Sequence, residues 1–205
     1  MKNEERLGIP ALIVLLNGAV GGVSAFLMTS RMMENLSKMC DIPAGVFAFL
    51  IALGSVIGAI VASMLYWLIT TAIFYGISAI FGGKGSFKRT LEFVGYGYIP
   101  AIFAWIISAA LTYHLVSTLT LPHIPAGAKP MEISHILQTR AQALTRHPLS
   151  KISSAVGILF TLWSANIWIF AVKHARGLTT RNALLTVGIP VGAYIAYSLC
   201  LLLLA

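Results

Sequence analysis

The sequence predicts an all-α protein, a polytopic helix bundle that crosses a membrane five times. Of its 205 residues, 58% are hydrophobic and only 10% are charged, which is too few charges to cover a water-exposed surface. The mean hydropathy is +0.87, and several uncharged runs are long enough to span a bilayer. We therefore expect one membrane domain. The same composition excludes most soluble enzyme folds and disordered chains.

Five apolar runs define the expected spans. A transmembrane helix needs about 20 apolar residues, so four of the runs are single crossings with some allowance for tilt. The second run is too long for one straight crossing and short for two. The runs cover approximately residues 10–29, 44–81, 91–119, 152–172 and 183–205.

The positions of the basic residues favour one crossing by residues 44–81. Cytoplasmic loops carry an excess of Lys and Arg, and a second crossing would place two short basic loops opposite the amino terminus. With one crossing, the amino terminus lies inside and the carboxyl terminus outside. The inner side then holds eight basic residues: Lys2, Arg6, Lys84, Lys88, Arg89, Lys173, Arg176 and Arg181. The outer side holds six: Arg31, Lys38, Lys129, Arg140, Arg146 and Lys151.

The net charge of +8 is therefore interpreted as an orientation signal, and we expect no nucleic-acid partner.

The outer connector, residues 120–151, begins with prolines and then becomes compatible with a short amphipathic helix. Cys40 and Cys200 both fall toward the outer side, either as two free thiols or as a pair if their helices are neighbours.

Small residues recur at four-residue spacing in the first two spans. The first span carries Gly18 and Gly22, and the second carries Gly54, Gly58 and Ala62, with other small residues alongside. Helices in lipid associate by close backbone approach over such residues. The pattern indicates either packing between the two spans or a face for homo-oligomers.

The third and fifth spans each contain a proline near the expected membrane middle, Pro100 and Pro190. Each proline removes a backbone hydrogen bond and crowds the carbonyl four residues earlier. One interpretation is a pair of packed kinks. The other is a pair of broken helices around a polar site, as in secondary transporters. The candidate kink and pathway residues are Gly95, Tyr96, Gly97, Tyr98, Pro100, Trp163, Asn166, Trp168 and Pro190.

Polar residues inside the spans are the candidates for a substrate path or for hydrogen bonds between helices. Asn166 stands out because it falls between two tryptophans near the middle of a span. The set is Asn17, Ser63, Thr70, Thr71, Ser108 and Asn166.

Signals for catalysis are weak. No span has a charged residue in its central part, and the five histidines follow no zinc-binding spacing. We therefore expect no enzyme activity, no metal and no cofactor.

The two short basic loops are the candidate partner-binding face. Glycines at the end of the second span allow a sharp turn at the membrane surface. Exposed Lys and Arg at such a surface attract anionic lipid headgroups or an acidic protein. The candidate residues are Gly82, Gly83, Lys84, Phe87, Lys88, Arg89, Glu92, Lys173, Arg176 and Arg181.

Two motifs resemble the Yip domain family of small multi-pass membrane proteins. They are Gly82-Gly83-Lys84-Gly85-Ser86-Phe87 and Gly95-Tyr96-Gly97-Tyr98-Ile99-Pro100, and the segment around Trp163, Trp168 and Gly177-Leu178 is similar to the family's later half. The resemblance implies five membrane helices with a cytoplasmic amino terminus. In eukaryotes the family is associated with Rab-type GTPases and with vesicle budding or fusion. About nine residues precede the first span, so the sequence is most similar to the short bacterial and archaeal form.

We therefore expect a non-enzymatic protein of the cell membrane, or of an endomembrane in a eukaryote. It would act as a membrane-organising or partner-binding scaffold through its basic cytoplasmic loops. The alternative is a small transporter or channel that uses the kinked third and fifth helices.

Overall fold

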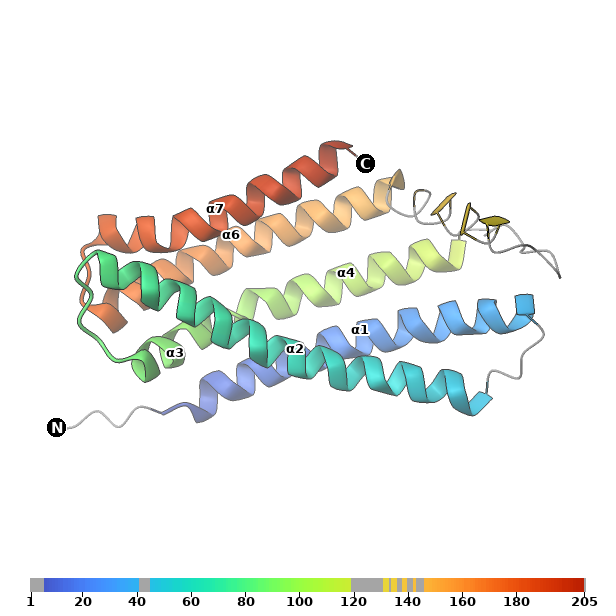
Figure 1. Cartoon of the computed structure of the whole chain (residues 1–205), viewed down its shortest axis with the longest axis horizontal. Helices are drawn as coiled ribbons and strands as arrows, with labels where there is room; N and C mark the ends of the chain where they lie inside the picture. Colours follow the sequence, from blue (N-terminus) through green and yellow to red (C-terminus); the bar gives the residue numbers. More distant parts are fainter. Residues whose placement is uncertain are drawn as a thin grey trace.

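The computed structural model describes residues 6–40, 45–118 and 146–204, together with a few isolated positions between 131 and 142. The regular structure in these ranges is helical, without strands, as the sequence predicts. Figure 1 shows the long helices running side by side along one axis. The helices are α1 (Gly8–Cys40), α2 (Gly45–Ile80), α3 (Phe87–Tyr96), α4 (Ile99–Thr118), α6 (Pro148–Arg176) and α7 (Thr180–Leu204).

Four helices, α1, α2, α6 and α7, are long and apolar enough to cross a membrane. The number rises to five if α3 and α4, which are bent by 42° at a short break, count as one span. The five predicted runs correspond to these helices, with the third run divided between α3 and α4. The fold is therefore that of a multi-pass membrane protein.

The second run, residues 44–81, forms one uninterrupted helix, α2, of 36 residues. A continuous helix is the geometry that a single crossing by this run requires. The first run differs from its prediction, because α1 continues past residue 29 to Cys40 through Arg31, Glu34 and Lys38. Its Gly8–Ser30 part is apolar enough for a span.

Both short basic loops lie at the same end of the bundle as the start of α1. Figure 1 shows the α2–α3 turn, the α6–α7 turn and the start of α1 together on the left. We call this the basic end, defined by Arg6 and by residues 81–89 and 173–181, and the opposite end the far end. A hydrogen bond of 3.0 Å from the Lys84 amide to the Arg176 carbonyl joins the two turns directly. The bundle thus gathers, among the described residues, Arg6 and the two basic loops that the charge count assigns to one side.

The two prolines have different consequences. The chain breaks at Gly97 and Tyr98, and Pro100 is the second residue of α4, where a proline fits the first helical turn. Pro190 lies inside α7, which continues through it to Leu204. Of the two interpretations, the pair of broken helices is therefore wrong for α7, and among the described helices the division falls in the third run.

Glycines of α1 let α1 and α2 pack closely. A Cβ built on Gly18 would lie 2.9 Å from the Ile60 Cα, and one on Gly22 would lie 3.2 Å from the Val56 Cα. On α2 the small residues that face α1 are Ala59 and Ser63, whose atoms lie 3.4 and 3.0 Å from that Gly18 Cβ, whereas a Cβ built on Gly54 or Gly58 would meet no atom within 4 Å and both glycines are exposed. The sequence does not show which face of α2 packs against α1, because α2 is apolar all round.

The outer connector and its amphipathic helix lie for the most part outside the described residues. The same holds for the side chain of Cys40, so its pairing is not among the described contacts. Cys200 is a free thiol exposed on α7.

Replacing Gly18 with Ala should destabilise the protein, whereas Gly58→Ala should not. The new methyl at position 18 meets α2 backbone, and such overpacking costs about 1–3 kcal/mol. At position 58 the same change adds only helix propensity, worth about 0.5–1 kcal/mol in favour of Ala. Thermal unfolding in detergent, followed by tryptophan fluorescence, should show a lower midpoint for Gly18→Ala alone. Equal shifts for both variants would contradict the assigned interface.

Candidate functional site

Glycines end α2 with a sharp turn at the basic end. Gly82 has a φ of 77°, the left-handed conformation that favours glycine. The Gly83 amide donates to the Ser78 carbonyl at 2.9 Å, and the Gly82 amide donates to the Ala79 carbonyl at 3.0 Å. This is the Schellman pattern of a helix end, and it satisfies carbonyls that the helix itself leaves free. The chain can then reverse within a few residues and enter α3.

The guanidinium of Arg176, the last residue of α6, holds this turn in place. Its Nε donates to the Ser78 hydroxyl at 2.8 Å, Nη2 donates to the Gly83 carbonyl at 2.8 Å, and Nη1 donates to the Gly85 carbonyl. The group also lies over the Tyr75 ring, 4.0 Å from its centroid. Only 3% of Arg176 is exposed. We call these contacts the Arg176 network.

The network explains two of the glycines in the first motif. A Cβ on Gly85 would overlap the carbonyl oxygen of Ala175, and one on Gly83 would lie 2.9 Å from the Ser78 carbonyl oxygen. Both positions therefore need a residue without a side chain so that the turn can lie against the end of α6.

Arg176 does not belong to the exposed docking face where the sequence placed it. A buried guanidinium with five N–H donors is stabilised by surrounding acceptors, and here backbone carbonyls supply most of them. The spacing of charges along the chain does not reveal the burial of Arg176, because a single Arg beside a glycine in a short loop is expected at the surface. Its role at this site is to position the turn.

The other cations of the basic end remain at the surface. Lys84, Lys88, Arg89 and Arg181 are exposed, as is Arg6 before α1, and Lys173 is half-buried. Two of them are carried by α3, whose first turn is capped by the Ser86 hydroxyl accepting from the Arg89 amide at 3.1 Å. Glu92 is half-buried on the same helix, and Phe87 packs edge-on against Tyr75 with ring centroids 5.4 Å apart.

Two indoles stabilise the break between α3 and α4. The Trp168 Nε1 donates to the Val94 carbonyl at 2.9 Å, and the Trp67 Nε1 donates to the Leu91 carbonyl at 3.0 Å. The Val94 carbonyl also accepts the Gly97 amide at 3.0 Å, so the Trp168 indole adds a second donor at the end of α3. The tryptophans come from α6 and α2, so the break is held from two sides.

The glycines of the second motif make room for these contacts. A Cβ on Gly97 would collide with the Trp168 indole. One on Gly95 would lie 2.6 Å from the Pro10 Cβ and 3.3 Å from the Trp67 Nε1. Both positions must therefore stay small.

An aromatic cluster forms around the break. Tyr98 is 3% exposed and packs edge-on against Trp168 and Tyr66, at centroid distances of 5.7 and 6.1 Å. Phe74 contacts the other side of Trp168 at 5.6 Å. The Tyr98 hydroxyl lies 3.4 Å from the Thr70 hydroxyl. The cluster packs the interior of the bundle between the basic end and the middle of the helices.

The remaining pathway candidates do not join this cluster. Trp163 is 54% exposed and stacks on Phe160, and Asn166 is exposed on the same helix. Tyr96 is half-buried, and Pro190 is half-buried in the unbroken α7. Thus the structure separates Trp168 from the two residues that the sequence grouped with it.

On the far-end side of the aromatic cluster lies a cavity of about 800 Å³. Its walls come from α1, α2, α4 and α6, with one residue from α7, and many lining residues are Gly or Ala. Tyr98, Trp168 and Asn17 line the end near the cluster, while Met28 and Tyr113 lie toward the far end. None of the lining residues is charged. Asn17, Ser63 and Ser108, which the sequence singles out as polar span residues, all line this cavity.

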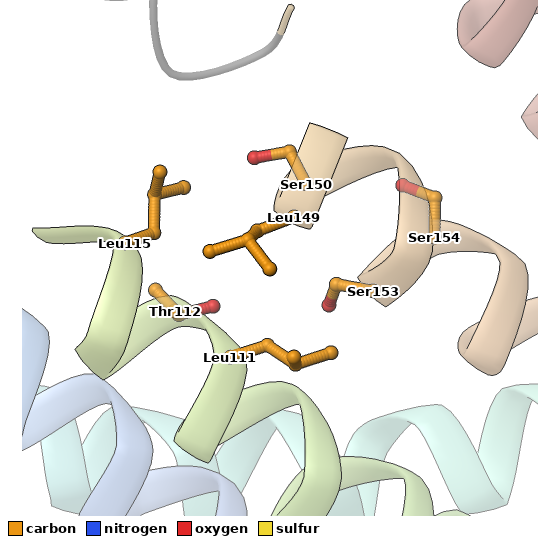
Figure 2. A pocket seen from close by; sticks show the side chains of 7 residues that line it. All are labelled: Leu111, Thr112, Leu115, Leu149, Ser150, Ser153 and Ser154. Atoms are coloured by element: carbon orange, nitrogen blue, oxygen red, sulfur yellow. The ribbon is translucent and has the colours of Figure 1, made fainter. Parts of the chain in front are cut away.

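A smaller hollow of about 220 Å³ lies between α4 and α6 at the far end. Figure 2 shows that Ser150, Ser153 and Ser154 line it from α6, opposite leucines and Thr112 of α4. Thr112 lines the large cavity as well, so the two spaces are neighbours. In the described part of the chain, no group of three His, Cys, Asp or Glu residues is arranged to hold a metal ion.

Replacing Arg176 with Gln should loosen the α2–α3 turn. Gln cannot reach all three acceptors, and charged hydrogen bonds of this kind are worth about 1.5–3 kcal/mol each. Limited trypsin digestion after Lys84 should become faster, while the exposed control Arg181→Gln should leave that rate unchanged. Equal rates for both variants would show that Arg176 does not hold the turn.

The model of the Yip1 domain family matches residues 1–202. A relative in Methanocaldococcus jannaschii, an uncharacterized protein, is 33% identical over 114 residues, which are 56% of this chain and 78% of that protein. No solved structure gives a significant match. The chain therefore belongs to the Yip1 domain family and resembles a short prokaryotic form of it.

Proposed function

We propose that this protein is a non-enzymatic membrane-organising protein whose basic end binds anionic lipid headgroups at the cytoplasmic surface. The observation that carries the proposal is the group of exposed cations at one end of the bundle. Lys84, Lys88 and Arg89 belong to a turn and helix that the Arg176 network holds against α6. Arg181 is exposed at the start of α7, in the neighbouring turn.

Electrostatics support this function. Each Lys or Arg near an anionic membrane surface contributes about 1 kcal/mol of attraction. Held in fixed turns, these side chains present their charges together and lose little backbone freedom on binding. The positive-inside rule assigns this end to the cytoplasm, where anionic lipids concentrate.

A transporter or channel is the weaker candidate. A path through the bundle would have to pass Tyr98, Phe74 and Trp168, which are buried in the aromatic cluster. Asn166, the polar residue expected on such a path, is exposed on the outside of α6. These observations favour the docking function.

Charge reversal at Lys88 and Arg89 should weaken lipid binding at the basic end. The matched control reverses Arg146 and Lys151, two exposed basic residues at the far end. Native mass spectrometry of protein released from nanodiscs containing phosphatidylglycerol would count the retained anionic lipids. Loss of the two attractions, about 1 kcal/mol each, should lower the apparent affinity by about tenfold or more.

The control should retain binding close to that of the unaltered protein. Equal retention of anionic lipid by both double variants would contradict the proposal. If both retain it, capture of an acidic protein becomes the better account of the basic end.

A further inference from the structure

The large cavity combines a neutral lining with a buried polar group. Its volume of about 800 Å³ falls within the roughly 300–1,000 Å³ range of ligand sites. Aromatic rings and small residues form most of its wall, and none of the lining residues carries a charge. Because an unpaired charge at this depth is costly, the cavity suits an uncharged, mainly apolar molecule.

The side chain of Asn17 is only partly satisfied by hydrogen bonds. The side chain is 6% exposed, lines the cavity, and donates from Nδ2 to the Ser63 hydroxyl at 3.0 Å. Ser63 in turn donates to the Val14 carbonyl at 3.1 Å, so its hydroxyl serves Asn17 as an acceptor. The Asn17 Oδ1 is left as a buried acceptor without a hydrogen bond within the described residues.

The other hydroxyls around the cavity do not supply the missing donor. Ser24 donates to the Val20 carbonyl at 3.0 Å, and Thr161 donates to the Gly157 carbonyl at 2.8 Å. A buried acceptor without a partner costs about 1–3 kcal/mol. A molecule in the cavity that carries one O–H could remove that cost after a small rotation of the Asn17 amide.

We propose that the cavity binds an uncharged lipid with a single hydroxyl on a long apolar chain. The hydroxyl donates to the Asn17 Oδ1 near the middle of the bundle. The chain lies along the small and aromatic residues toward Met28 and Tyr113, at the end of the cavity nearer the far end. Phospholipid headgroups are excluded because the lining offers no cation to receive a phosphate. This site is distinct from the basic end, and either proposal can fail without the other.

The test uses the full chain in nanodiscs and two probes that differ in one group. The first is hexadecanol with a diazirine at the middle of its chain, and the second is its methyl ether, which cannot donate a hydrogen bond. After illumination, peptide mass spectrometry locates the labelled residues. The alcohol should label residues of α1, α4 and α6 that line the cavity. Its labelling should exceed that of the ether by about three- to tenfold, the difference in affinity that one hydrogen bond gives.

Variants separate the hydroxyl contact from the space for the chain. Asn17→Leu should abolish the preference for the alcohol, whereas Asn166→Leu, an asparagine exposed on α6, should preserve it. Ala104→Phe fills the cavity and should remove labelling by both probes. If Asn17→Leu fails to fold, the alcohol-to-ether ratio of the unaltered protein and the Ala104→Phe result still test the proposal.

Equal cavity labelling by alcohol and ether in the unaltered protein would overturn the proposal, because the space would then hold chains or water without recognising a hydroxyl. Labelling confined to the outer, lipid-facing residues would overturn it as well.

Discussion

The structure depends on two indole N–H groups that tie the short helix α3, beside the break, to its neighbours. The break between α3 and α4 interrupts the backbone ladder of the third run, and the Val94 carbonyl there accepts both the Gly97 amide at 3.0 Å and the Trp168 indole at 2.9 Å. Trp67 and Trp168 donate to α3 from two different helices, so the break also ties α2 and α6 to α3. Gly95 and Gly97 allow the approach, and Tyr98 completes the packing.

This break divides the molecule into two parts with different chemistry. On one side, α3 is short and carries Lys88 and Arg89 at the surface, beside the turn that Arg176 holds. On the other side, α4 tilts away by 42°, and the cavity opens between it, α1, α2 and α6. Without the bend, α4 would continue along the axis of α3. The bend therefore lies between the exposed cations of the basic end and the apolar cavity.

Much of this architecture could be predicted from the sequence, because the signals are compositional. Run lengths predict the helices, and the positions of Lys and Arg predict which turns lie together. Which face of a helix packs against its neighbours could not be predicted, since α2 and α6 are apolar on most faces and carry no clear periodicity. For that reason Gly58 and Asn166 were assigned to the interior, although both are exposed. The burial of Arg176 was likewise missed, because it depends on carbonyls of residues that are remote in the chain.

The most direct test of this account is the thermal stability of Trp168→Phe, with Trp163→Phe as the control, both measured in nanodiscs. Phenylalanine keeps an aromatic ring in the cluster but removes the N–H donor to the Val94 carbonyl. The account predicts a loss of about 1–2 kcal/mol for Trp168→Phe, a midpoint lower by several degrees. Trp163 is exposed, so its replacement should leave the midpoint almost unchanged. Equal midpoints for the two variants would contradict the claim that the indole stabilises the break.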